Sequence, residues 1–116
     1  MIGTVDLVIA GDGSGARAAA VSALTRGQRV LIVLRAADAR AARCLRTTLL
    51  TTAGALGNQL RVMASGEVVC VDGVDGVEAV VVRHVPTGYL SAVNASAFVS
   101  FEPHQRAAEG PEQVVA

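Results

Sequence analysis

The chain contains no lysine and no tryptophan, and it has only three aromatic residues, one tyrosine and two phenylalanines. The absence of lysine excludes phosphate loops of the Walker type and the dehydrogenases that pair a tyrosine with a lysine four residues further on. So few aromatic side chains argue against stacking on nucleic-acid bases. Ten arginines balance ten acidic residues, so the net charge is zero and offers no attraction for DNA, RNA or an acidic membrane. We therefore expect no nucleic-acid partner and no membrane partner.

Cysteine and histidine are also scarce. Cys44 and Cys70 form no Cys-x-x-Cys pair, which excludes a locally encoded redox pair or zinc knuckle. In a chain rich in alanine and valine, we expect both cysteines to be small buried hydrophobic residues. His84 and His104 have no cysteine or acid at ligand spacing, so no metal site is predicted. No apolar run reaches the roughly 18 residues of a membrane span, and no signal peptide precedes the first strand, so a cytoplasmic location is expected.

The first third of the chain has a regular pattern of apolar residues. Residues 5–10 form a nearly continuous apolar run that ends at glycines, as a strand buried on both faces does. Residues 14–26 are helix formers that end at Gly27, and residues 29–34 form a second buried strand. The predicted helix carries one apolar stripe, made of Ala16, Ala19, Ala20, Ala23 and Leu24. This order predicts a right-handed strand–helix–strand unit.

The remaining elements complete a fold prediction. A second helix, capped by Asp38, is expected to bury Ala41, Cys44, Leu45, Thr48 and Leu49 and to fade near residues 54–57. Further strands are predicted at 60–64, 67–72, 77–85, 89–93 and 97–101. We predict an α/β, Rossmann-like three-layer domain with a central parallel sheet and a β-meander on one face. The nucleotide-binding domain is assigned to residues 1–102 and a flexible tail to residues 103–116.

The glycines after the first strand carry the main functional signal. In the spacing Gly11-x-Gly13-x-x-Ala16, Gly11 permits a tight turn, Gly13 lets the backbone approach a pyrophosphate, and small Ala16 lets helix and strand pack closely. The helix N-terminus offers free N–H groups and a partial positive charge to phosphates. Asp12 opposes this interpretation, because it adds a negative charge to the loop unless its side chain turns away to cap the turn.

The end of the second strand selects among nucleotides. Sites for NAD and FAD usually carry an acid about 20 residues after the glycines, but here Arg35 stands there, followed by Arg40. Arginine suits a 2′-phosphate, which favours NADPH, with NADH as the alternative. The alternative interpretation is that both arginines are solvent-exposed charges at the start of a helix and bind no ligand. The candidate cofactor-binding residues are Gly11, Asp12, Gly13, Ser14, Gly15, Ala16, Arg35 and Arg40.

Residues 5–99 resemble the pyridine-nucleotide-binding domain of thioredoxin-reductase-like, FAD-dependent disulfide oxidoreductases. Residues 9–33 match that family's glycine loop, helix and strand. Of its His-Arg-Arg-x-x-x-Arg-Ala run, which grips the NADPH phosphate, the stretch 34–41 keeps Arg35, Arg40 and Ala41. Residues 77–88 resemble the family's hairpin with its Thr-Gly turn, and 97–99 its returning strand; Glu102-Pro103-His104 replaces the closing glycine turn.

The resemblance implies a partner as well as a ligand. The family's FAD domain and its Cys-x-x-Cys have no counterpart here, so no catalytic residue is predicted. We expect a free-standing NAD(P)(H)-binding domain, a subunit or relic of a flavoprotein oxidoreductase, that meets FAD only through a partner chain. The alternatives are a structural domain without cofactor that forms a homo-oligomer or binds a partner, and a sensor of another adenine nucleotide.

Overall fold

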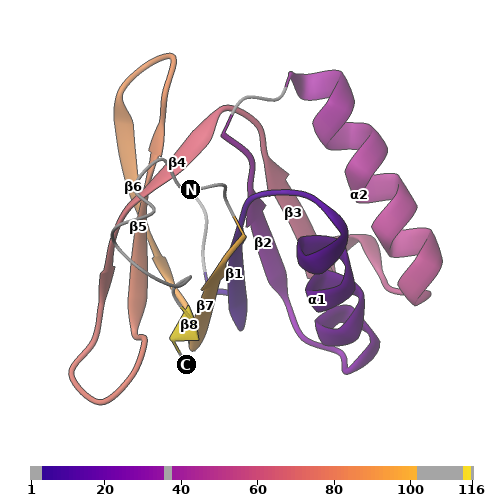
Figure 1. The fold of residues 1–116 in the computed structure, drawn as a ribbon, viewed down its shortest axis with the longest axis horizontal. Coiled ribbons are helices and arrows are strands. Elements are labelled where there is room, and N and C mark those ends of the chain that lie inside the picture. Colours follow the sequence, from indigo (N-terminus) through magenta and orange to yellow (C-terminus); the bar gives the residue numbers. More distant parts are fainter. Residues whose placement is uncertain (1–3, 36–37, 102–113, 116) are drawn as a thin grey trace.

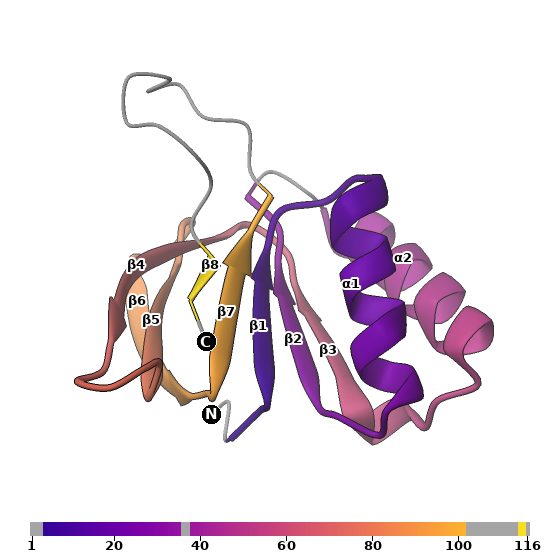
Figure 2. The same cartoon turned by 60° about the horizontal axis from the view of Figure 1, so that its bottom comes forward.

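The molecule has three layers, with a central sheet between two helices and a second, smaller sheet (Figures 1 and 2). The computed structural model describes residues 4–35, 38–101 and 114–115. The α/β architecture predicted from the sequence, with a parallel sheet and a meander on one face, is confirmed.

The central sheet has the strand order β3-β2-β1-β7-β8. Its first four strands are parallel, and the short β8 pairs antiparallel with β7. Strands β1 and β2 are almost fully buried apolar runs, as the sequence predicts for a sheet covered on both faces. The bounds of the strands of this sheet are β1 Leu7–Ala10, β2 Val30–Val33, β3 Leu60–Met63, β7 Ala97–Ser100 and β8 Val114–Val115.

Two helices cover one face of this sheet (Figure 2). Helix α1, Ser14–Thr25, begins directly after the glycine loop. Helix α2, Ala39–Ala53, begins at Asp38, whose carboxylate accepts a 2.8 Å hydrogen bond from the backbone N–H of Ala41. It ends at Gly54, where the left-handed backbone, with φ of 66°, favours glycine. The predicted Asp38 cap is confirmed.

The opposite face is covered by an antiparallel meander of order β4-β5-β6, which leads the chain from β3 to β7. Strands β5 and β6 are joined by a turn at Gly88, where φ is 75°. The register between β4 and β5 shifts between Val68 and Cys70, because the backbone bulges there. The bounds are β4 Gly66–Asp72, β5 Ala79–His84 and β6 Tyr89–Asn94.

The sheet separates two apolar clusters, one on each face. Ile9 and Ile32 face the helices, whereas Val8 and Leu31, their neighbours along β1 and β2, face the meander. The helix side also contains Ala16, Ala20, Ala23, Leu24, Leu45 and Leu49, and the meander side contains Val33, Val80, Val82, Val93 and Phe98. Small alanines on α1 allow the helix to approach the sheet closely.

Two burial predictions are wrong. Helix α2 buries Ala42, Leu45 and Leu49, whereas Ala41, Cys44 and Thr48 are exposed, because its packed stripe is rotated from the predicted one. Cys70 is exposed as well, because it follows the β4 bulge and lies on the outer face of the meander, opposite Val81. Both thiols are free and exposed, contrary to the expected burial.

The predicted tail falls mostly outside the described residues. Glu102-Pro103-His104 and the rest of 102–113 lie there, as does residue 116, so the predicted domain boundary stays a prediction. Val114–Val115 pairs with Phe98 and Val99 of β7. Within the described ranges, no helix is long and apolar enough to cross a bilayer.

Candidate functional site

The glycine loop, residues 11–13, lies between the carboxyl end of β1 and the first turn of α1. The N–H of Gly11 donates to the carbonyl of Val33 at 2.9 Å, which fixes the loop beside the end of β2. Gly11 and Gly13 have φ of 110° and 117°, a region that residues with a side chain rarely adopt. Ligands of open α/β sheets bind at this edge, so the loop stands where a nucleotide site is expected.

The positions in and after the glycine loop differ in how much space surrounds them. A Cβ on Gly13 would meet no atom within 4 Å, so that side of the loop is open. A Cβ on Gly15 would lie only 2.9 Å from the ring of Phe101, which follows β7. Ala16 is 2% exposed and belongs to the core beneath α1. Gly15 and Ala16 are thus packed against neighbouring residues, whereas Gly13 faces open space.

Backbone donors are available beside Gly13. The N-cap residue of α1 is Gly13, which has no side chain to cap the helix. The first N–H that bonds within the helix is that of Arg17, which donates to the carbonyl of Gly13 at 3.0 Å. The N–H groups of the first turn, including those of exposed Ser14 and Gly15, thus have no acceptor within the helix. Free donors at a helix N-terminus next to an open glycine fit the pyrophosphate of a dinucleotide.

The charge of Asp12 is compensated within the loop. Arg17 donates to Asp12 from Nε at 3.1 Å and from Nη2 at 3.4 Å. The hydrogen bond from Arg17 lowers the pKa of Asp12 below its ordinary value, and a bond from the Gly13 backbone lowers it further. Asp12 thus turns toward Arg17, and the objection that it places an unbalanced negative charge in the loop is removed.

This pair predicts a small pH-dependent contribution to stability. Because the pKa of Asp12 is lowered in the folded state, the stabilisation is present above about pH 4 and is lost as the pH falls through the lowered value. Asp12→Asn should reduce the free energy of unfolding at pH 7 by less than about 1 kcal/mol, since both side chains are half exposed. Urea unfolding at pH 7 and at pH 2.5 checks this.

The matched control is Asp75→Asn, which changes an exposed aspartate with no ion pair among the described residues. It should leave stability unchanged at both pH values. An Asp12→Asn deficit that persists at pH 2.5 would contradict the assigned role of the ion pair.

Arg35 follows β2 and takes part in an ion cluster with Glu67 and Arg83. Its Nη2 lies 3.5 Å from Oε1 of Glu67 on β4, while Arg83 on β5 pairs with the other carboxylate oxygen of Glu67. The Glu67 side chain is 16% exposed, whereas both arginines are about half exposed. Two guanidinium groups thus lie beside the carboxyl end of β2, with the carboxylate of Glu67 between them.

Arg40 is placed differently. It is the second residue of α2, is exposed, and makes no hydrogen bond or ion pair with any part of the chain that the structure describes. Glu67, Arg83 and Arg17 were not predicted as site residues. The sequence places Glu67 and Arg83 on neighbouring strands, but their pairing depends on the register of the bulged hairpin.

The sequence matches no protein-family model and no curated protein. Solved structures share the fold. The FAD-dependent chondrochloren halogenase CndH, from a myxobacterium, superposes with a TM-score of 0.65 at 16% identity, over 88% of this chain and 38% of its own. Thioredoxin reductase from Streptococcus pyogenes gives 0.63 at 21%, over 88% and 32%. The flavin-dependent monooxygenase PieE, solved with FAD, gives 0.64 at 13%, over 88% and 31%.

These similarities show that the fold is shared by flavin-dependent enzymes of several kinds. The chain spans about one third of the length of each of these proteins.

Proposed function

We propose that this chain is a dinucleotide-binding unit of a flavoprotein-type oxidoreductase and that it holds a pyridine nucleotide, NADPH or NADH, at the glycine loop. The observation that carries the proposal is the open backbone at Gly13, with φ of 117°, beside the unbonded N–H groups of the first turn of α1. An open glycine with donors on one side suits a pyrophosphate, and no neighbouring atom fills the space beside it.

Some residues of the site would bind the phosphates of the nucleotide, and others would hold the loop in position. The N–H groups of Ser14 and Gly15 would donate to phosphate oxygens, and Gly11 would keep the loop beside β2. Arg35 would meet the ribose end of the ligand. A nicotinamide ring, when bound, supplies or accepts a hydride. The described residues contain no assigned catalytic group, so an acceptor flavin would come from a partner chain or from further sequence.

The ion cluster around Glu67 supports a phosphorylated ligand. The guanidinium groups of Arg35 and Arg83 can pair with a 2′-phosphate, whereas the carboxylate of Glu67, which a ribose hydroxyl would need, already pairs with both arginines. This favours NADPH over NADH.

FAD is a second candidate ligand for the same loop. It is favoured by the shared fold of the halogenase and the monooxygenase, both described as flavin-dependent, the latter solved with FAD. The pyrophosphate of FAD has the same requirements at Gly13 and α1. Under this alternative, FAD binds directly to this chain, and no partner chain is needed to supply the flavin.

Calorimetric titration with NADPH, NADH and FAD tests the proposal. We expect NADPH to bind more tightly than NADH, and Arg35→Ala together with Arg40→Ala to abolish that preference, because the phosphate loses its counter-charge. Arg43→Ala, an exposed change on α2, should leave the ratio of the two dissociation constants unchanged.

Each remaining outcome has a distinct meaning. Tight binding of FAD with weak binding of both pyridine nucleotides would show that FAD, and not NADPH or NADH, is the ligand of the glycine loop. No binding of any of the three at millimolar concentration would overturn the proposal and favour a structural domain without cofactor. A stable oligomer observed by light scattering would then support that function.

A further inference from the structure

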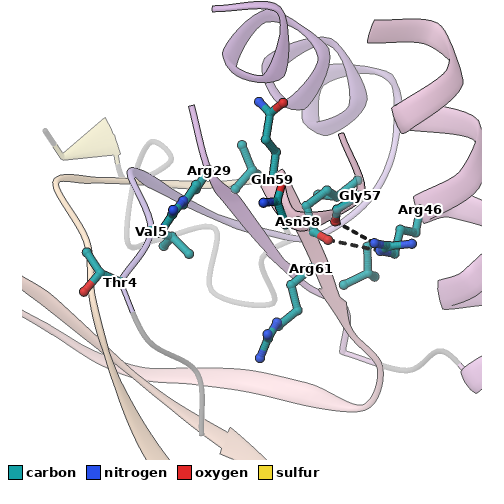
Figure 3. Close-up of a pocket in the computed structure, with 11 residues that line it drawn as sticks. Thr4, Val5, Arg29, Arg46, Gly57, Asn58, Gln59 and Arg61 are labelled. Carbon is teal, nitrogen blue, oxygen red and sulfur yellow. Dashed lines mark hydrogen bonds between the residues drawn. The ribbon is translucent and has the colours of Figure 1, made fainter. Parts of the chain in front are cut away.

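A cavity lies at the amino ends of the parallel strands, at the edge of the sheet opposite the glycine loop. Its volume is about 620 Å³, within the range of small-molecule sites. It is formed by the residues before β1 and at the starts of β2 and β3, together with Arg46 of α2 (Figure 3). Because the strands are parallel, this cavity cannot belong to the dinucleotide site.

The lining of this amino-end cavity is basic. Three of the chain's ten arginines, Arg29, Arg46 and Arg61, line it, and no aspartate or glutamate among the described residues does. The polar residues beside them, Thr4, Asn58 and Gln59, are uncharged. Asp6 follows the lining residue Val5 in the sequence, and its Oδ2 accepts a 2.8 Å hydrogen bond from the backbone N–H of Arg29.

Arg46 is held in place and keeps donors to spare. Its Nε donates to the carbonyl of Leu60 at 3.0 Å and its Nη2 to the carbonyl of Gly57 at 2.6 Å, two bonds that Figure 3 shows. A guanidinium group has five N–H donors, so three are not used by these bonds. The two carbonyl bonds fix the orientation of a planar cation at the cavity, which lowers the entropic cost of binding an anion.

Arg29 and Arg61 come from neighbouring strands. Val30 pairs with Leu60 and both face the helices, so the alternation of the strands places Arg29 and Arg61 together on the other face. Both are exposed, and neither side chain makes a hydrogen bond or ion pair within the described ranges. Two arginine side chains on adjacent strands, with no ion pair among the described residues, can both contribute positive charge to a bound anion.

We infer that the amino-end cavity binds a small anion carrying two or more carboxylate or phosphate groups. Arg46 supplies a pre-oriented fork for one oxyanion, and Arg29 and Arg61 supply charge for another. The site is independent of the proposed nucleotide function, because it uses none of the residues at the glycine loop or in the Glu67 cluster.

The test follows the amide signals of the isotope-labelled full chain by NMR during titration with citrate and, separately, with pyrophosphate. Both anions should shift the signals of residues 57–62, and Arg29→Gln with Arg61→Gln should weaken that binding by at least about tenfold. Arg26→Gln with Arg43→Gln removes the same charge from the helices and should leave the affinity nearly unchanged.

The outcomes separate this inference from the proposed function. Shifts from citrate alone, or from pyrophosphate alone, at residues 57–62 would identify a carboxylate or a phosphate ligand. Shifts confined to residues 11–16 would support the glycine loop and overturn the amino-end site. Equal weakening in the two double variants, or no shift at 57–62 with either anion, would overturn it as well.

Discussion

Replacing Leu31 with alanine is expected to lower the free energy of unfolding by about 2–5 kcal/mol. Leu31 is fully buried in β2, one of the inner strands of the sheet, and packs in the cluster between that sheet and the meander. The loss combines the transfer energy of the deleted atoms with the cavity that they leave. Because a domain of this size is only marginally stable, much of its stability would be lost. Urea denaturation followed by circular dichroism measures the change.

Leu56→Ala is the matched control. It makes the same chemical change at a side chain that is 70% exposed, in the segment after α2, and should alter stability by no more than about 0.5 kcal/mol. Similar effects of the two substitutions would show that the sheet and the meander do not share a packed core.

Gly13→Ala is expected to weaken dinucleotide binding by at least about tenfold while the domain still folds. At φ of 117° an added methyl strains the backbone by about 1–3 kcal/mol, and it would also occupy the open space through which a phosphate approaches. Titration of the variant with NADPH and FAD measures the affinity, and thermal unfolding measures the stability.

Gly88→Ala separates strain from binding. Gly88 also has a positive φ, 75°, and open space for a Cβ, but it lies in the β5–β6 turn. Its replacement should cost stability and leave nucleotide affinity unchanged. If both variants lose affinity in proportion to their stability, the loop at Gly13 is a structural turn and does not hold a phosphate.

Most of the fold was predictable because its patterns are local. Every predicted strand within the described residues is present, with boundaries within about two residues, because continuous apolar runs ended by glycine have few other solutions. The rotation of α2 was not predictable from spacing alone. Ala41 and Ala42 are equally apolar, and packing against the sheet and α1 buried the second.

The candidate site also has a part that the sequence predicts and a part that it does not. The glycine loop follows from one short segment, so its position and its left-handed backbone could be predicted. The pairing of Arg35 with Glu67 joins residues from β2 and β4 and depends on the path of the chain between them. The compensation of Asp12 by Arg17 depends on a side-chain rotamer, which no pattern of residue types encodes.

The pairing of β1 with β7 has a consequence for how the chain folds. Leu7 lies beside Ala97, so β1 receives one of its two neighbouring strands only about 90 residues after it has been made. Contacts so distant in sequence slow folding, since the intervening loop must close first. Until then an apolar strand edge is open to other chains. A fragment that ends before residue 97 should therefore aggregate, whereas the chain through Ser100 has the strand that closes this edge.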